Sequence, residues 1–423
     1  MPIIYKKLWK LLIDSDMKKK DLRMAAGIST NALAKLGKNE RVTTDVIEKI
    51  CMTLHCDVGD IMEYSDGRKP KSENRKRASC LRYAEFCAGV GGFRLGIEQS
   101  RLKAVPVYAN EVNDSCEKTY RQNFGRGFDS KDIFKIDIGN LPDFDMLCAG
   151  FPCQPFSAAG KELGFSDSRG TVFFRLMEII AEKQPRIVFL ENVPNLVRHD
   201  KGRTFKVILD ELEKAGYTVS TKILDSSYFG VPQSRSRIYI VGLQKRIYGD
   251  LYITFTERLT EKTPLRPYLI PGDNSMPVSK RWDEYIDYYL GHKKKEEITF
   301  DIPPSRKSLE RVAADCNLED CVFQVRSSGV RALSIDRPLP TLTVLNSGGG
   351  AHIPILSKER RRLSINEMKR IMGFPDTYDF SAVSRTDAAK QLANAVCPPV
   401  IASICDDIGI TLDNAGIDVF ESE

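Results

Sequence analysis

The chain has 423 residues, 42% of them hydrophobic and 28% charged, with a formal net charge of +6. This length exceeds one typical domain, so we expect two or three domains of ordinary globular composition. We find no apolar run long enough to span a bilayer and no signal-peptide pattern at the start, and we therefore expect a cytoplasmic protein. Eleven cysteines without regular spacing and only four histidines predict reduced thiols and no metal site.

The positive charge is concentrated near the start of the chain. Residues 1–80 hold 17 Lys and Arg against 11 Asp and Glu, which accounts for the whole net charge. An acidic partner such as nucleic acid is therefore expected in this part of the chain. A solvated basic face would give the same count.

Apolar residues repeat at helical spacing through residues 1–66, and Gly27 separates one helical pattern from the next. A helix capped by Ser29 after this glycine fits a helix-turn-helix. The unit resembles the phage-repressor type of DNA-binding domain, which implies DNA contacts by Ser29, Thr30, Asn31 and Lys35. A helical bundle used for dimerisation is the alternative. Residues 67–80 are polar and basic, as expected of a flexible linker.

Short apolar runs alternate with helical patterns over residues 81–245. This alternation predicts an α/β domain with a mainly parallel sheet and helices on both faces. The rhythm is lost over residues 246–337, where aromatics, prolines and a basic run indicate a separate, irregular domain. A helical pattern returns in the C-terminal segment, residues 338–423.

A strand, a Gly-rich turn and a helix are predicted around Gly89, Gly91 and Gly92. Glycines at such a turn let the backbone approach a ligand closely, although a tight turn without a ligand has the same pattern. Glu111 follows the next apolar strand, where it can accept both hydroxyls of a ribose. Asp137 follows the third, where it can accept an adenine amino group. This order indicates an adenosyl-type cofactor.

Residues 150–157 read Gly-Phe-Pro-Cys-Gln-Pro-Phe-Ser. Prolines on both sides should hold Cys153 on a shaped loop at the end of a strand, although a single cysteine is also a common buried side chain. Glu191 ends another buried strand, where a carboxylate needs a role or a partner such as a salt bridge. Arg235 and Arg237 share one side of an extended segment and could bind a base or form a basic rim.

These motifs, in this order, resemble those of the bacterial cytosine-5 DNA methyltransferases, as do RPLPTLT at 337–343 and QLANAV at 391–396. The likeness runs from about residue 81 to 404, apart from the variable stretch at 246–337. It implies a Rossmann-like, S-adenosylmethionine-dependent sheet with a small target-recognition domain at 246–337. The implied reaction transfers a methyl group to carbon 5 of a flipped-out cytosine in duplex DNA through a covalent Cys153 adduct.

The resemblance also assigns roles to single residues, with two departures from the family pattern. Cys87 stands where the family usually has Phe, and Ala393 where it usually has Gly. The implied catalytic residues are Cys153, Glu191, Arg235 and Arg237. The implied cofactor-binding residues are Phe86, Cys87, Ala88, Gly89, Gly91, Gly92, Glu111, Val112, Asp137, Ile138, Pro152 and Asn394. Further implied DNA contacts are Gln154, Ser157 and Gln233.

A fused DNA-binding unit suggests a restriction-modification methylase that controls its own promoter. A restriction endonuclease is then the expected system partner, the nucleoid the expected location, and the N-terminal unit a candidate dimerisation domain. Two alternatives remain open at this stage. One is a tRNA cytosine-5 methyltransferase, and the other is a repressor whose larger domain only senses the cofactor.

Overall fold

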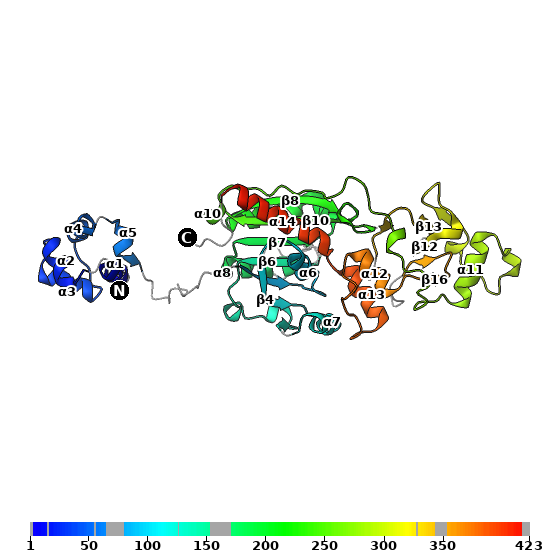
Figure 1. Cartoon of the computed structure of the whole chain (residues 1–423), viewed down its shortest axis with the longest axis horizontal. Helices are drawn as coiled ribbons and strands as arrows, with labels where there is room; N and C mark the ends of the chain where they lie inside the picture. The colour runs from blue at the N-terminus through cyan, green and yellow to red at the C-terminus, as the bar shows by residue number, and fades with distance from the viewer. Residues whose placement is uncertain are drawn as a thin grey trace, which may run out of the picture. The chain divides into compact units, whose positions relative to one another are not determined.

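The computed structural model describes residues 3–14, 17–54, 56–64, 80–125, 127–152, 171–326, 329–342 and 353–416. The chain divides into two compact units, Met1–Arg77 and Ala78–Glu423, which we describe separately (Figure 1). Nearly all of the predicted linker lies outside the described residues, and so do Cys153, Gln154 and Ser157.

The N-terminal unit is a small helical domain closed by a pair of short strands. Its elements are β1 (Ile3–Ile4), α1 (Lys6–Asp14), α2 (Lys19–Ala25), α3 (Thr30–Gly37), α4 (Thr44–Leu54), α5 (Val58–Ile61) and β2 (Glu63–Tyr64). Leu8, Leu22 and Leu36 are fully buried in its core. Gly27 adopts a φ of +61° between α2 and α3, and the Ser29 hydroxyl accepts the Ala32 N–H at 3.0 Å. This turn and cap are the ones that the sequence predicts.

A seven-stranded sheet forms the centre of the larger unit. Its strands are β3 (Leu81–Phe86), β4 (Ala104–Asn110), β5 (Phe128–Asp129), β6 (Met146–Gly150), β7 (Ile187–Asn192), β8 (Tyr217–Asp225) and β10 (Ser236–Gln244), in the order β5-β4-β3-β6-β7-β10-β8. The strand β10 runs antiparallel to both of its neighbours, β7 and β8, and the other pairs of neighbouring strands are parallel. The sheet is therefore mainly parallel, as predicted.

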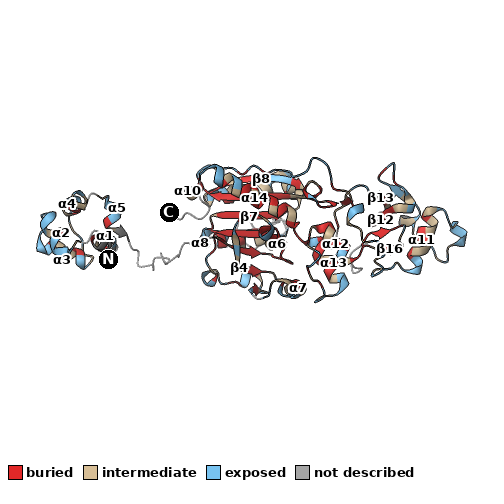
Figure 2. Ribbon diagram, viewed as in Figure 1, coloured by how far each residue is buried: buried red, intermediate tan, exposed pale blue. Residues whose placement is uncertain are grey.

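Helices cover both faces of this sheet, so its central strands are buried on both sides (Figure 2). On one face, α6 (Gly92–Gln99) and α14 (Pro398–Asn414) pack against alternate strand residues such as Met146 and Phe189. On the other face, α8 (Val172–Lys183) and α9 (Arg203–Lys214) pack against Leu147 and Leu190. Successive residues of each strand point to opposite faces of the sheet, so each strand contributes side chains to both hydrophobic cores.

The last helix lies directly against the first helix of the sheet domain. A Cβ atom at Gly96 in α6 would lie 2.5 Å from the Ile401 Cβ and 2.6 Å from the Pro398 carbonyl oxygen of α14. By length and apolar composition Arg385–Asn414 could cross a membrane, yet 61% of its most apolar window is buried inside the fold. Its apolar character is therefore that of a core helix. The segment is also divided, because α13 (Arg385–Asn394) ends before α14 begins.

A smaller sheet lies in the variable part of the chain. Its strands are β11 (Leu309–Arg311), β13 (Gly329–Ser334), β12 (Cys321–Arg326), β15 (Ile355–Leu356) and β16 (Arg361–Arg362), in this spatial order, and α11 (Lys280–Leu290) packs on it. The expected border at residue 337 therefore does not limit this sheet, because β15 and β16 come from beyond it. At the other border, Ile253 and Phe255 pack in the core of the large sheet.

Shorter elements complete the larger unit. The helices are α7 (Asp114–Phe124), α10 (Lys245–Tyr248) and α12 (Ile365–Met372), and β9 (Gln233–Ser234) pairs in parallel with β14 (Leu339–Pro340). The 3-10 turns are η1 (Ile133–Lys135), η2 (Ile138–Asn140), η4 (Pro194–Val197), η5 (His199–Gly202), η6 (Ser226–Phe229), η7 (Arg266–Tyr268), η8 (Lys295–Glu297), η9 (Pro304–Arg306) and η10 (Leu318–Asp320).

Candidate functional site

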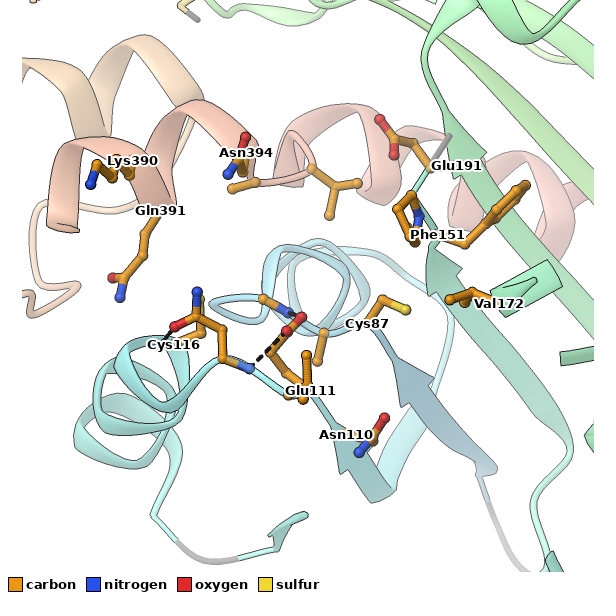
Figure 3. A pocket seen from close by; sticks show the side chains of 18 of the residues that line it. Cys87, Asn110, Glu111, Cys116, Phe151, Val172, Glu191, Lys390, Gln391 and Asn394 are labelled. Carbon is orange, nitrogen blue, oxygen red and sulfur yellow. Dashed lines mark hydrogen bonds between the residues drawn. The ribbon is translucent and has the colours of Figure 1, made fainter. Parts of the chain in front are cut away.

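A cavity of about 860 Å³ opens at the carboxyl ends of the central strands. From β3 the chain continues through β4 and β5 on one side of the sheet and then crosses to β6 and β7 on the other. Such a reversal of strand order leaves a crevice between the loops that follow the strands, where open α/β sheets bind ligands. Figure 3 shows Cys87, Glu111, Glu191 and Asn394 on different sides of this cavity.

The turn after β3 has a backbone that few residue types adopt. Cys87 and Gly89 have φ values of +51° and +53°, and Gly91 caps α6 with a φ of +76°. A Cβ atom at Gly91 would also lie 2.5 Å from the Phe124 ring, so this position requires glycine on two grounds.

The residues predicted around this turn divide into two groups. Cys87, Ala88 and Gly89 line the cavity. Phe86, Gly91 and Gly92 do not line it. Phe86 is fully buried, and the two glycines let the start of α6 lie close to Phe124 and Val396.

A buried carboxyl group lies just before this turn. Glu85 in β3 is 0% exposed, and burial raises its pKa to about 8, while the charge of Arg94 opposes the shift. Because a buried charged carboxylate is unfavourable, Glu85 carries a proton near neutral pH.

Glu111 and Val112 follow β4 and line the cavity. One carboxylate oxygen of Glu111 accepts the Gly89 N–H at 3.2 Å, and the other accepts the Asn113 N–H at 3.1 Å. The carboxylate is thereby fixed beside the turn, with lone pairs left for ligand hydroxyl groups.

The structure contradicts the expected position of Asp137 and Ile138. The strand β5 ends at Asp129, and the residues after it that line the cavity are Asp132, Ile133 and Phe134. The Asp137 carboxylate instead caps η2, where it accepts the Gly139 N–H at 3.1 Å. The chain holds two Asp-Ile pairs five residues apart. Because β5 has only two residues, the apolar pattern could not show which pair follows the strand.

A buried ion pair lies at the end of β7. Glu191 is 8% exposed, and one of its carboxylate oxygens lies 3.0 Å from the Nε of Arg237 in the neighbouring β10. Burial raises the pKa of Glu191, and Arg237 and Arg235 oppose this shift. Glu191 can therefore hold or share a proton more readily than an exposed glutamate.

Arg235 lies beside this pair and is 3% exposed. One Nη donates to the Ala395 carbonyl at 2.9 Å. Its Nε and other Nη have no hydrogen-bond partner among the described residues. Burial, together with the charge of Arg237, lowers its pKa to about 10. Buried donors normally find acceptors, so this guanidinium is suited to a ligand in the cavity.

Two more segments complete the cavity. Pro152 lines it after β6, and the Asn192 side chain donates to the Phe151 carbonyl at 2.9 Å, which fixes the backbone two residues before Cys153. Asn394 lines the cavity at the end of α13. The residues that follow it pack against the start of α6, next to the Gly-rich turn. There a Cβ atom at Gly92 would lie 2.6 Å from the Val396 carbonyl oxygen.

Gln233 does not lie where a DNA contact would be made. It is 0% exposed, its side-chain nitrogen donates to the Ile371 carbonyl at 3.1 Å, and its oxygen accepts the Leu342 N–H at 3.0 Å. The predicted DNA contact is therefore wrong in this structure, because the amide is used to join three segments inside the fold.

Comparison with solved structures defines the class of fold. Fission yeast (S. pombe) Dnmt2 methyltransferase matches with a TM-score of 0.55 at 18% identity, covering 80% of this chain and 100% of that one. The Entamoeba histolytica methyltransferase EhMeth matches with a TM-score of 0.53 at 19% identity, covering 80% and 99%. The larger unit thus has the fold of these methyltransferases.

The sequence comparisons identify the family. The model for C-5 cytosine-specific DNA methylases matches residues 81–409, and that for the Cro/C1-type helix-turn-helix DNA-binding domain matches residues 7–67. The chain is similar to the type II methyltransferases M1.ScrFI of Lactococcus lactis subsp. cremoris (37% identity over 339 residues, 79% of each chain) and M.HhaI of Haemophilus parahaemolyticus (32% over 346 residues, 80% of this chain and 97% of that one).

The chain therefore belongs to the C-5 cytosine-specific DNA methylase family, with a Cro/C1-type DNA-binding domain at its N-terminal end. It is a DNA cytosine-5 methyltransferase, and the fold class and enzyme class expected from the sequence are confirmed.

Proposed function

We propose that this enzyme transfers the methyl group of S-adenosylmethionine to carbon 5 of a flipped-out cytosine within a specific duplex sequence. We propose further that it is the methylase of a restriction-modification system. The observation that carries the proposal is that one cavity combines the Gly-rich turn and Glu111 with the buried Glu191–Arg237 pair.

The cavity residues suit S-adenosylmethionine. A volume of about 860 Å³ lies within the usual range of small-molecule sites. The backbone from Cys87 to Gly89, the Glu111 carboxylate, Asp132 and Asn394 would hold its adenosyl and amino-acid parts. When bound, this cofactor supplies the activated methyl group that carbon 5 receives.

The protein's own residues would carry the rest of the reaction. The Cys153 thiolate forms a bond to carbon 6, and the displaced ring electrons make carbon 5 nucleophilic. Glu191 shares its proton with the ring nitrogen and so limits the negative charge on the ring. Arg237 donates to the base carbonyl oxygen. After methylation, the carbon-5 proton leaves to a base, the sulfur–carbon 6 bond breaks, and the thiolate and the aromatic ring are restored.

The burial of Glu191 supports the proposed base flipping. A cytosine stacked in a duplex cannot bring its ring to a carboxylate that is 8% exposed, so the nucleotide must leave the helix. Residues in and around the smaller sheet would read the sequence next to it.

For the N-terminal unit we propose binding to the enzyme's own promoter, as a dimer. Thr30 and Asn31 are exposed at the start of α3, the end of a recognition helix that contacts base edges. The system partner would be a restriction endonuclease that cuts the same sequence, and the enzyme would act at the nucleoid.

The test combines a transfer assay with sequencing. Purified full-length protein, labelled S-adenosylmethionine and mixed-sequence DNA should give labelled DNA, and Cys153→Ala should abolish the label. Bisulfite sequencing of DNA from an expressing host should then show one modified motif. Label on RNA but not on DNA, or full activity of the Cys153 variant, would contradict the proposal. Gel shifts with upstream DNA and Asn31→Ala test the regulatory part separately.

A further inference from the structure

Phe134 is an aromatic side chain that the fold holds at the mouth of the cavity. It lines the cavity beyond β5, and 44% of its surface is exposed. Val112, which follows the neighbouring β4, lines the same cavity and is 63% exposed. Two large apolar side chains left open at one pocket form a surface that a ligand can cover.

The backbone that carries Phe134 is fixed on both sides. Ile133 and Ile136 are 6% and 5% exposed and pack in the core under the sheet. Arg175 of α8 donates to the carbonyl oxygens of both residues, at 3.1 and 2.5 Å. The Asp132 carboxylate accepts the Phe134 N–H at 3.1 Å. Because the neighbouring isoleucines take the inward positions, the Phe134 ring is directed outward.

We infer that Phe134 binds the adenine ring of the cofactor. This inference rests on the proposed function, in which S-adenosylmethionine occupies the cavity. Adenine has two apolar faces and a polar edge, so it requires apolar surface together with a hydrogen-bond acceptor. Phe134 and Val112 provide the surface, and Asp132 provides the carboxylate between them in the chain. The backbone of this turn is already fixed, so Phe134 can contact the base without a rearrangement of the chain.

The contact predicts a particular pattern of binding losses. An aromatic ring against a base strengthens binding by roughly tenfold. Since Phe134 would touch only the adenine, its removal should weaken the binding of adenosine and the binding of S-adenosylhomocysteine by the same factor. It should raise the KM for S-adenosylmethionine and leave kcat and the KM for DNA unchanged.

Calorimetric titration of the full-length protein with S-adenosylhomocysteine tests this inference. We expect Phe134→Ala to weaken binding roughly tenfold and Phe134→Trp to keep an affinity within about threefold of that of the wild type. The affinity of Phe134→Leu should lie between those of Phe134→Ala and the wild type. Tyr252→Ala is the matched control, because Tyr252 is 62% exposed but does not line the cavity. Thermal unfolding without ligand should be the same for all variants, which separates lost contact from lost fold.

The outcomes distinguish the inference from the proposed function. If the wild-type protein and Phe134→Ala bind S-adenosylhomocysteine equally tightly, the role of Phe134 is overturned and the proposed cofactor is retained. Absence of any binding by the wild-type protein would overturn the proposed cofactor, and the role of Phe134 with it. A loss for S-adenosylhomocysteine without a loss for adenosine would show that Phe134 contacts another part of the cofactor, which also overturns the inference.

Discussion

Replacing Gly96 by alanine tests whether the close contact between α6 and α14 stabilises the catalytic fold. The added Cβ would lie 2.5 Å from the Ile401 Cβ and 2.6 Å from the Pro398 carbonyl oxygen, about 1 Å closer than ordinary contact at 3.4–4 Å. A backbone oxygen cannot rotate away, so one helix must shift. Overpacking of this kind costs about 1–3 kcal/mol, and better helix propensity returns roughly 0.5–1 kcal/mol. We therefore expect a net loss of about 1–2 kcal/mol.

Thermal unfolding of the full-length protein measures this loss. For a unit of this size we expect the melting temperature to fall by about 1–3 °C. Gly409→Ala is the control, because Gly409 lies in α14 and a Cβ there would meet nothing within 4 Å. That variant should be neutral or slightly stabilised. If Gly96→Ala is as stable as Gly409→Ala, the helices are not as close as described, and the reasoning fails.

Three further substitutions give separate predictions. Glu85→Gln should flatten the pH dependence of stability. The wild-type pKa of about 8 lies above the unfolded value, so the stabilisation is present at low pH and falls by roughly 2–3 kcal/mol between pH 6 and 9 in urea unfolding. Arg237→Met leaves Glu191 buried and unpaired; methyl transfer should fall at least about 100-fold, while calorimetry shows cofactor affinity within about threefold. Ser29→Ala removes the α3 cap and should lower the stability of the N-terminal unit by about 1 kcal/mol in hydrogen exchange, without changing methyl transfer.

Each of these has an outcome that would count against it. Equal loss of stability between pH 6 and 9 in the wild type and Glu85→Gln would remove the role given to that carboxyl, and Glu257→Gln is the control, because Glu257 is exposed and does not contribute to the pKa shift of Glu85. Normal methyl transfer by Arg237→Met would show that the ion pair is only structural. Unchanged exchange in α3 after Ser29→Ala would mean that its cap is unimportant.

The sequence predicts those features that depend on short stretches of chain. The strand, turn and helix around Gly89 and Gly91 follow from local pattern, and the acid after β4 lies at the cavity as expected. The Ser29 cap is equally local. In each case the residues that decide the structure are within a few positions of one another.

Features decided by distant packing could not be predicted in this way. Asp132 and Asp137 have the same local pattern, and only the end of a two-residue strand separates them. The burial of Gln233 depends on Leu342 and Ile371, more than 100 residues away. The small sheet takes strands from both sides of residue 337, and aromatic composition carries no information about strand pairing.

The packing of α14 on α6 also bears on the order of events during synthesis. The N-terminal helices contact one another within about 60 residues and can form as soon as that segment leaves the ribosome. The cavity, in contrast, needs Asn394, and the first strand of the sheet is supported by a helix made some 300 residues later. Contacts of such separation form late. A new molecule can therefore have a folded DNA-binding unit before it has a complete catalytic cavity.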